Sequence, residues 1–179
     1  WANGKDAPYQ VMTEEEICTW IQQQNVTKVT LTGGEPLLQP GIDVLLKCLS
    51  RENLRIEIET NGSVGLAGFV GIGENIRFTM DYKLNASGMT EHMCVDNFAL
   101  LSKKDTVKFV SGSRDDLEQA REIIETYHLT EVCKVYISPV FGQIDPADIV
   151  DYMIEHHQNG VRLQLQLHKF IWDPQRRGV

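Results

Sequence analysis

The chain has 179 residues, which predicts one domain, and its 42% hydrophobic and 23% charged residues indicate a globular protein and exclude intrinsic disorder. The net charge of −8 argues against nucleic-acid binding as the main function, because phosphate affinity requires clustered Lys and Arg. No apolar run reaches the ~18 residues of a membrane span and no signal-peptide pattern opens the chain, so we expect a cytoplasmic protein with no membrane contact.

A helix, a strand and a second helix are predicted first. The capping-box sequence Thr13-Glu14-Glu15-Glu16 predicts the start of a helix that ends near Gln24. Residues 27–32 predict a strand. Pro40-Gly41 opens the second helix, whose inner face is expected to be apolar: Ile42, Leu45, Leu46 and Leu49.

The rest of the chain continues this alternation. Further strands are expected at 54–60, 76–84, 105–110, 132–138 and 161–171. A weak helix is expected at 91–101, a longer one after the cap at Ser113, and another from the Asp145-Pro146 start to about Gln158. Residues 63–75 are expected to form a loop. Strands that alternate with helices through short connections indicate an α/β fold with a parallel sheet, here as a single domain over 1–179.

The four cysteines are Cys18, Cys48, Cys94 and Cys133, and none belongs to a C-x-x-C pair. Because three of them fall in helix or strand patterns, we expect Cys18, Cys48 and Cys133 to be buried free thiols in a reducing cytoplasm. A disulfide framework is not expected at this size and spacing.

Polar and apolar residues alternate along the predicted strands, as in Lys28, Thr30 and Thr32 against Val29 and Leu31. Side chains on a strand alternate faces, so one face of the sheet is expected to meet the helices and the other to be polar. The polar face either is simply solvated or lines the cavity of a barrel or partial barrel. The barrel is favoured because polar residues gather where strands end, the edge at which α/β folds bind ligands: Thr32, Thr60, Asn61, Asp81, Lys83, Ser138 and His168.

The stretch Thr32-Gly33-Gly34-Glu35-Pro36 ends the first predicted strand. Its glycines leave the backbone open to close approach by a ligand, and Glu35 adds a carboxylate acceptor. The same pattern also fits an ordinary tight turn between a strand and a helix.

Several segments resemble one enzyme superfamily. Thr32-Gly33-Gly34-Glu35-Pro36 resembles the GGEP motif of radical S-adenosylmethionine (SAM) enzymes, and Glu59-Thr60-Asn61-Gly62 resembles their second signature. The run Leu163-Gln164-Leu165-Gln166-Leu167-His168-Lys169 and the opening Trp1-Ala2-Asn3-Gly4 are similar to the 7-carboxy-7-deazaguanine synthase family within it. The resemblance implies a partial (β/α)6 barrel of the radical SAM type.

The resemblance also implies a reaction. 6-Carboxy-5,6,7,8-tetrahydropterin would be contracted to 7-carboxy-7-deazaguanine with loss of ammonia, on the route to queuosine. A reduced 4Fe-4S cluster would cleave SAM to start the radical chemistry. Mg²⁺, a flavodoxin-type electron donor and a homodimer are implied as well. The alternatives are another radical SAM enzyme, of the glycyl-radical activase type, and a cluster-free module that binds SAM or pterin.

By position, the family's binding residues transfer to this chain, and no side chain is implied to be catalytic. The substrate-binding residues would be Thr32, Gln166, His168 and Val179. The SAM-binding residues would be Gly33, Gly34, Glu35, Asn61, Lys83, Asn85, Ser87, Ser138, Pro139, Val140 and Phe141.

The family's cluster is held by three closely spaced cysteines, with an adjacent Thr at Mg²⁺, and this chain contains no such triplet. Trp1 matches the segment just after that cysteine loop. We therefore expect an enzyme whose N-terminal region is absent from this sequence, rather than a protein that has lost its cluster.

Overall fold

A computed structural model describes residues 10–174 and 176, and its centre is one parallel sheet of six strands. The strands are adjacent in sequence order, β1 to β6, which confirms the predicted parallel α/β architecture. Their bounds are Lys28–Leu31 (β1), Arg55–Thr60 (β2), Ile76–Tyr82 (β3), Thr106–Ser111 (β4), Lys134–Pro139 (β5) and Val161–Leu163 (β6).

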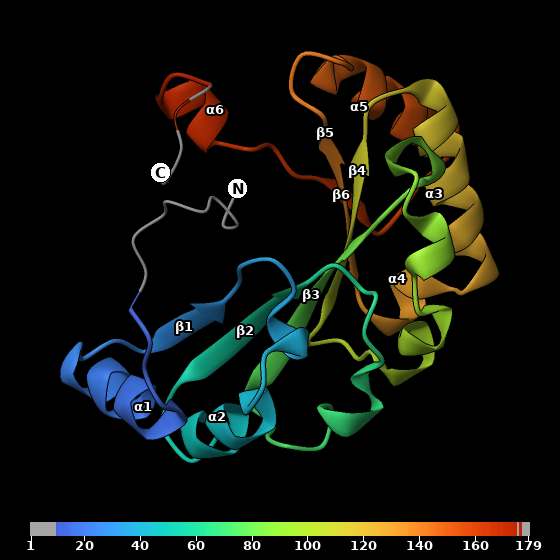
Figure 1. Ribbon diagram of the computed structural model, residues 1–179. Coiled ribbons are helices and arrows are strands. Elements are labelled where there is room, and N and C mark those ends of the chain that lie inside the picture. Colours follow the sequence, from blue (N-terminus) through green and yellow to red (C-terminus); the bar gives the residue numbers. More distant parts are fainter. Residues whose placement is uncertain (1–9, 175, 177–179) are drawn as a thin grey trace.

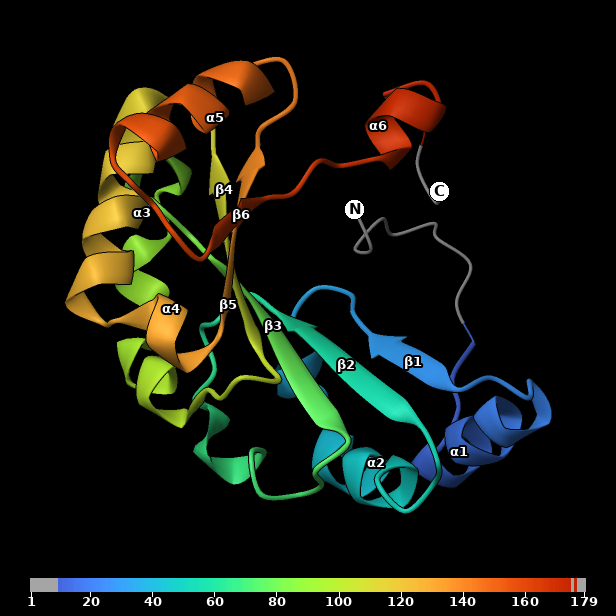
Figure 2. The same ribbon diagram turned by 180° about the vertical axis from the view of Figure 1, so that it is seen from behind.

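Helices α1 to α5 lie along the outer face of the curved sheet, and α6 stands apart on its open side (Figures 1 and 2). The α-helices are Glu14–Gln23 (α1), Ile42–Leu49 (α2), Arg114–Thr126 (α3), Leu129–Val132 (α4), Pro146–Glu155 (α5) and His168–Ile171 (α6). Short 3-10 helices occupy Pro36–Leu38, Leu66–Gly68, Asn85–Ser87, Thr90–His92 and Val95–Leu100. No helix of the described residues is long and apolar enough to cross a membrane.

Side-chain caps fix where the longer helices begin. The Thr13 backbone N–H donates to Glu16 at 2.8 Å, and the Glu16 N–H donates to the Thr13 hydroxyl at 3.2 Å, which confirms the capping box of α1. Ser113 caps α3 and Asp145 caps α5, where Pro146 takes the first helical position. These local signals explain why helix starts were predicted to within a residue.

The core lies between the sheet and the outer helices. Alternate strand residues such as Ile56, Phe78 and Val135 are at most 2% exposed, and their neighbours in sequence point to the opposite, polar face. The predicted inner face of α2 is buried throughout: Ile42, Leu45, Leu46 and Leu49. The alternation of polar and apolar residues along the strands therefore predicted correctly which face of the sheet the helices cover.

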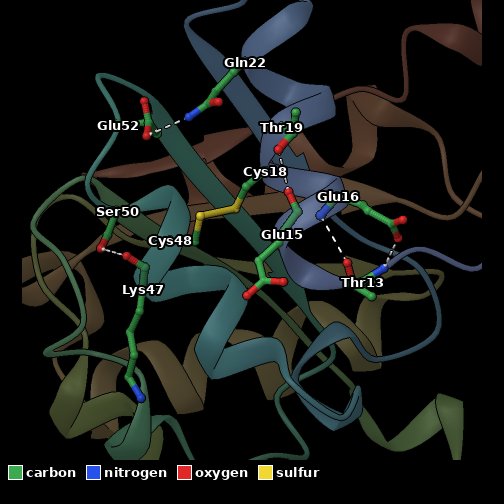
Figure 3. Close-up of a disulfide and its surroundings, with 10 residues drawn as sticks. All are labelled: Thr13, Glu15, Glu16, Cys18, Thr19, Gln22, Lys47, Cys48, Ser50 and Glu52. Carbon is green, nitrogen blue, oxygen red and sulfur yellow. Dashed lines mark hydrogen bonds between the residues drawn. A yellow bond between two sulfur atoms is a disulfide. The ribbon is translucent and has the colours of Figure 1, made fainter.

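The prediction of free thiols at Cys18 and Cys48 is wrong, because these residues form a disulfide between α1 and α2 (Figure 3). Their Cα atoms are 6.7 Å apart. Both cysteines lie on the facing sides of helices that pack against each other, a proximity that sequence spacing does not reveal. Cys94 and Cys133 are free, as predicted for Cys133, which is buried.

The predicted final strand over 161–171 is also wrong beyond Leu163. β6 ends there, the chain continues irregularly, and His168–Ile171 form α6. Among the described strands β6 is an edge strand that pairs with β5. β5 ends in Pro139, and proline has no N–H to extend a ladder. The alternation of Leu163, Leu165 and Leu167 therefore continues without a partner strand. Two smaller differences are the 3-10 turns in place of one helix at 91–101 and the unpredicted helix α4.

Candidate functional site

The glycine turn after β1 leaves bare backbone at the carboxyl edge of the sheet. Gly33 and Gly34 are exposed, and a Cβ added to either would meet no atom within 4 Å. Gly33 has φ of +136°, a conformation that other residues rarely adopt. The turn is therefore open to a ligand that approaches the main chain.

Glu35 faces the interior, and its carboxylate joins the end of β1 to the end of β2. One oxygen accepts from the Leu37 N–H at 3.1 Å. The other accepts from the Thr60 hydroxyl at 2.9 Å and from the Asn61 N–H at 2.7 Å. Glu35 is only 7% exposed, so this carboxylate holds the turn in place in addition to any contact with a ligand. The sequence alone indicated an acceptor here but not its internal partners.

Glu59 also lies at the candidate site, although the sequence did not predict it there. The Thr32 hydroxyl donates to its carboxylate at 3.1 Å, across the ends of β1 and β2. Glu59 is exposed on the polar face of the sheet, beside the glycine turn. Its position in the strand-end signature was the available signal, since alternation along β2 places it on the polar face.

Three hollows adjoin one another along the carboxyl edge of the sheet. The first, about 350 Å³, lies between the ends of β2 and β3, and the second, about 270 Å³, lies above β3, β4 and β5. The third, about 380 Å³, lies between the end of β5 and α6. Lys83 lines the first and second hollows, and Gln143 lines the second and third. We refer to these three hollows together as the rim.

Seven of the fifteen predicted site residues line this rim, and four more form the glycine turn and its carboxylate, residues 32–35. Those in contact with its hollows are Asn61, Lys83, Ser87, Pro139, Val140, Phe141 and Gln166. The Gln166 amide donates to the Pro139 carbonyl at 3.5 Å, which brings the C-terminal segment back to the end of β5. Phe170 of α6 meets Phe141 edge-on, with ring centroids 6.0 Å apart.

Three predicted residues lie elsewhere, and a fourth is not among the described residues. Asn85 is exposed, and its backbone N–H donates to Gln119 of α3 at 2.8 Å. Ser138 is 1% exposed within β5. His168 begins α6, whereas the sequence predicted it at a strand end. Val179 lies outside the described residues.

The charge at the centre of the rim is balanced within the protein. The Lys83 ammonium is 2.6 Å from one oxygen of Asp81, and both side chains are about one-third exposed. The other Asp81 oxygen is buried without a hydrogen-bond partner in the part of the chain that the structure describes. An ammonium has three donors, so Lys83 retains hydrogen-bonding capacity toward the first two hollows.

Comparison with known proteins identifies the family. The 7-carboxy-7-deazaguanine synthase of Clostridium acetobutylicum is 52% identical to this chain, over all of the chain and 81% of the relative. That of Chlorobaculum tepidum is 34% identical over 97% of the chain and 79% of the relative. This chain belongs to the 7-carboxy-7-deazaguanine synthase family. The resemblance seen in the sequence is thereby confirmed, although no family model matches the chain.

Solved structures support the radical SAM fold. QueE from Escherichia coli superposes with a TM-score of 0.58 at 22% identity, over 87% of this chain and 64% of that one. Streptococcus suis SuiB bound to precursor peptide SuiA gives a TM-score of 0.68 at 12% identity, over 92% of this chain and 45% of SuiB. The open six-stranded sheet of this synthase-family chain is thus the partial barrel that was predicted.

The rim and the glycine turn carry groups that suit SAM, whereas the described residues do not fit a 4Fe-4S cluster. SAM requires acceptors for an ammonium and donors for a carboxylate, and the bare turn and Lys83 offer them. The described residues contain no group of three His, Cys, Asp or Glu side chains that could hold a metal ion. Cys18 and Cys48 are bonded to each other, and burial raises the pKa of the Cys133 thiol to about 11. The described residues therefore offer no ligand set for such a cluster.

Proposed function

We propose that this protein converts 6-carboxy-5,6,7,8-tetrahydropterin to 7-carboxy-7-deazaguanine with loss of ammonia, in deazapurine and queuosine biosynthesis. The observation that carries the proposal is the 52% identity to a 7-carboxy-7-deazaguanine synthase over the whole chain. The rim geometry supports it, because the bare glycine turn and the adjoining hollows lie where α/β folds bind ligands.

We propose that SAM lies along the rim. Its ammonium would be held by the backbone of Gly33 and Gly34 and by the remaining acceptor capacity of Glu35, whose four lone-pair sites accept three internal bonds. Its carboxylate and ribose would lie in the hollow of Asn61 and Lys83, with Ser87 in the adjoining hollow. Its adenine would pack against Pro139, Val140 and Phe141 near Ser138, where the hollow is mainly apolar. When bound, SAM supplies the radical that starts the reaction.

We propose that the pterin binds over the polar sheet face beside this seat. Thr32 and Glu59 are hydrogen-bonded to each other there, and a carboxylate suits the adjacent N–H donors of a 2-aminopyrimidinone ring. Gln166 and His168 would close the site from the C-terminal segment, together with Val179. These side chains would orient the substrate and exclude water, and none needs to act as a general base.

Other parts of the proposal rest mainly on the family resemblance. They are Mg²⁺ as a cofactor, a flavodoxin-type electron donor, a homodimer and a cytoplasmic location. Exposed apolar side chains of α6, such as Phe170 and Ile171, are available for burial against a second copy. In a reducing cytoplasm Cys18 and Cys48 would be present as thiols for part of the time.

Two measurements test the proposed function. SAM binding to this chain, measured by calorimetry, tests the seat without a cluster, and Asn61→Ala together with Lys83→Ala should weaken it. Turnover of 6-carboxy-tetrahydropterin, followed by mass spectrometry in the complete, cluster-reconstituted enzyme, tests the reaction. A matched control is Lys47→Ala, which removes an exposed lysine from α2, away from the rim.

The outcomes separate the alternatives. Product with the mass of 7-carboxy-7-deazaguanine supports the synthase. SAM cleavage without that product would indicate a different radical SAM activity. The described residues hold no group of cluster ligands, which makes a cluster-free module that binds SAM the second candidate function. SAM binding without any SAM cleavage would favour this module.

A further inference from the structure

The polar face of the sheet carries a concentration of positive charge that the proposed reaction does not use. A cavity of about 330 Å³ lies on this face, below the rim. Its lining includes two carboxylates, Glu57 and Glu59, and six cationic side chains: Arg55, Arg77, Lys104, Lys108, Lys134 and Arg162. Four positive charges are thus in excess here, although the chain as a whole carries a net charge of −8.

The cations of this cavity are largely unpaired. Lys104 has a carboxylate within reach, Glu74 at 3.9 Å. Within residues 10–174 and 176 the other five form no ion pair, and the Glu57 carboxylate accepts from the Thr79 hydroxyl instead. The Nε of Arg77 is buried and has no hydrogen-bond partner among the residues that the structure describes. Because positive charges outnumber the carboxylates of the cavity, they repel one another, and this arrangement costs stability unless an anion joins it.

Strand register places three donors of the cavity in one row. Lys108 of β4 is opposite Tyr136 of β5, which is opposite Arg162 of β6. All three lie on the polar face, and neighbouring strands are about 4.8 Å apart, so the row spans roughly 10 Å. Lys134 and Arg77 lie nearer the amino ends of their strands and flank the row from below.

We propose that this cavity is a second ligand site, one that binds the polyphosphate group of a di- or triphosphate. A row of ammonium, phenol hydroxyl and guanidinium presents donors along a line, as a chain of phosphate oxygens requires. A single carboxylate would offset one charge, whereas a polyphosphate offsets most of the four in excess. The guanidinium groups of Arg77 and Arg162 provide the planar donor pairs that bind phosphate oxygens well.

This site is independent of the proposed reaction, because it uses none of the residues assigned to SAM. Glu59 borders both this cavity and the proposed pterin site. The ligand chemistry is shared by inorganic polyphosphate and by nucleoside triphosphates. Titrations with sodium tripolyphosphate and with the sodium salt of ATP, each without divalent metal ions, distinguish these sources.

The test is calorimetric titration of the chain with tripolyphosphate at about 50 mM salt, repeated for Lys108→Gln and Arg162→Gln. Each variant should weaken binding about tenfold, the loss expected for one charge-assisted hydrogen bond. Lys47→Gln removes the same charge from α2, where Lys47 is exposed, and should leave binding unchanged. Raising the salt to about 0.3 M should weaken binding in the unmodified chain by screening.

Arg162 is exposed on an edge strand, so its variant is expected to fold even if the Lys108 variant does not. Neutralising Lys108 should also leave the urea midpoint equal or higher, because it relieves repulsion. Absence of tripolyphosphate binding, or equal weakening by the Lys47 variant, would overturn the proposal. Tighter binding of ATP than of tripolyphosphate would identify a nucleotide as the ligand. The variants of this cavity should not change SAM binding, so absence of tripolyphosphate binding would leave the proposed function standing.

Discussion

Glu35 is the residue on which the geometry of the glycine turn depends. In Glu35→Gln an NH₂ group replaces one carboxylate oxygen. In one orientation of the amide this group faces the Leu37 N–H, and in the other it faces the Asn61 N–H. One buried donor is then unsatisfied, which costs about 1–3 kcal/mol. We expect the free energy of unfolding to fall by that amount and SAM affinity to fall with it. Urea denaturation and calorimetry measure the two effects.

Glu59→Gln is the matched control for Glu35→Gln. Glu59 is exposed and accepts one side-chain bond, from Thr32, so its amide variant should change the free energy of unfolding by less than about 0.5 kcal/mol. Equal stability of the two variants would show that the Glu35 carboxylate does not hold the turn.

At the residue scale, the sequence indicated which residues gather at the rim but not how they are bonded. The strand-end positions of Asn61 and Lys83 follow from alternation and from turn residues, which are local signals. The burial of Glu35 depends on Thr60 and Asn61 lying beside it, which only the register of β1 and β2 determines. His168 was wrongly predicted at a strand end for the same reason. β6 could reach His168 only beside a longer partner strand, and its partner β5 ends at Pro139.

At the scale of elements, the disulfide fastens the two N-terminal helices together. Cys18 and Cys48 enclose a loop with a sequence separation of 30, and closing such a loop stabilises the fold by about 3–4 kcal/mol in the chain-entropy model. We expect dithiothreitol to lower the free energy of unfolding by up to that amount. A Cys48→Ala variant should not respond to the reductant, and an unchanged urea midpoint in the unmodified chain would contradict the cross-link.

The contact of α3 with α5 gives a prediction for pH. Hydrogen bonds from Arg121 and from the Tyr152 hydroxyl lower the pKa of Glu118 to about 2, from an ordinary value of 4.5. A carboxyl group whose pKa is lowered by folding stabilises the fold above its unfolded pKa, and this contribution is lost as the pH falls from about 4.5 to about 2. Glu118→Gln should therefore be less stable than the unmodified chain at pH 7 and equally stable near pH 2.

The control for this pH dependence is Glu122→Gln, which removes the same charge from an exposed position of α3. The urea midpoints of Glu122→Gln should equal those of the unmodified chain from pH 7 to about pH 2. If Glu118→Gln kept a constant stability difference from pH 7 to pH 2, the hydrogen bonds to Arg121 and Tyr152 would not be responsible.

Element positions were predictable where local chemistry decides them. The capping residues Thr13, Ser113 and Asp145 bond to their own helices, so sequence neighbours contain the whole signal. The disulfide, the early end of β6 and the helix α4 depend on which elements pack together. Those contacts join residues far apart in the chain, and a single sequence does not encode them in any local pattern.

At the scale of the whole molecule, one contiguous core unites the N-terminal and C-terminal halves. Leu46 of α2 and Leu129 of α4 are both 0% exposed members of this core, at opposite ends of the sheet order. Truncating either to Ala should cost about 2–5 kcal/mol. Because the strands pair in one unbroken series, we expect both variants to shift the same cooperative urea transition with an unchanged slope.

Two probes make this prediction testable. Far-UV circular dichroism reports on all helices and strands, and tryptophan fluorescence reports on the three tryptophans of the chain, among them Trp20 of α1 and Trp172 after α6. Both curves should coincide for the unmodified chain and for each variant. Two separate transitions, with Leu46→Ala moving only the first and Leu129→Ala only the second, would instead show that the halves of the sheet unfold independently. The rim would then lie across two units, and SAM bound along it as proposed would contact both and should merge the two transitions into one.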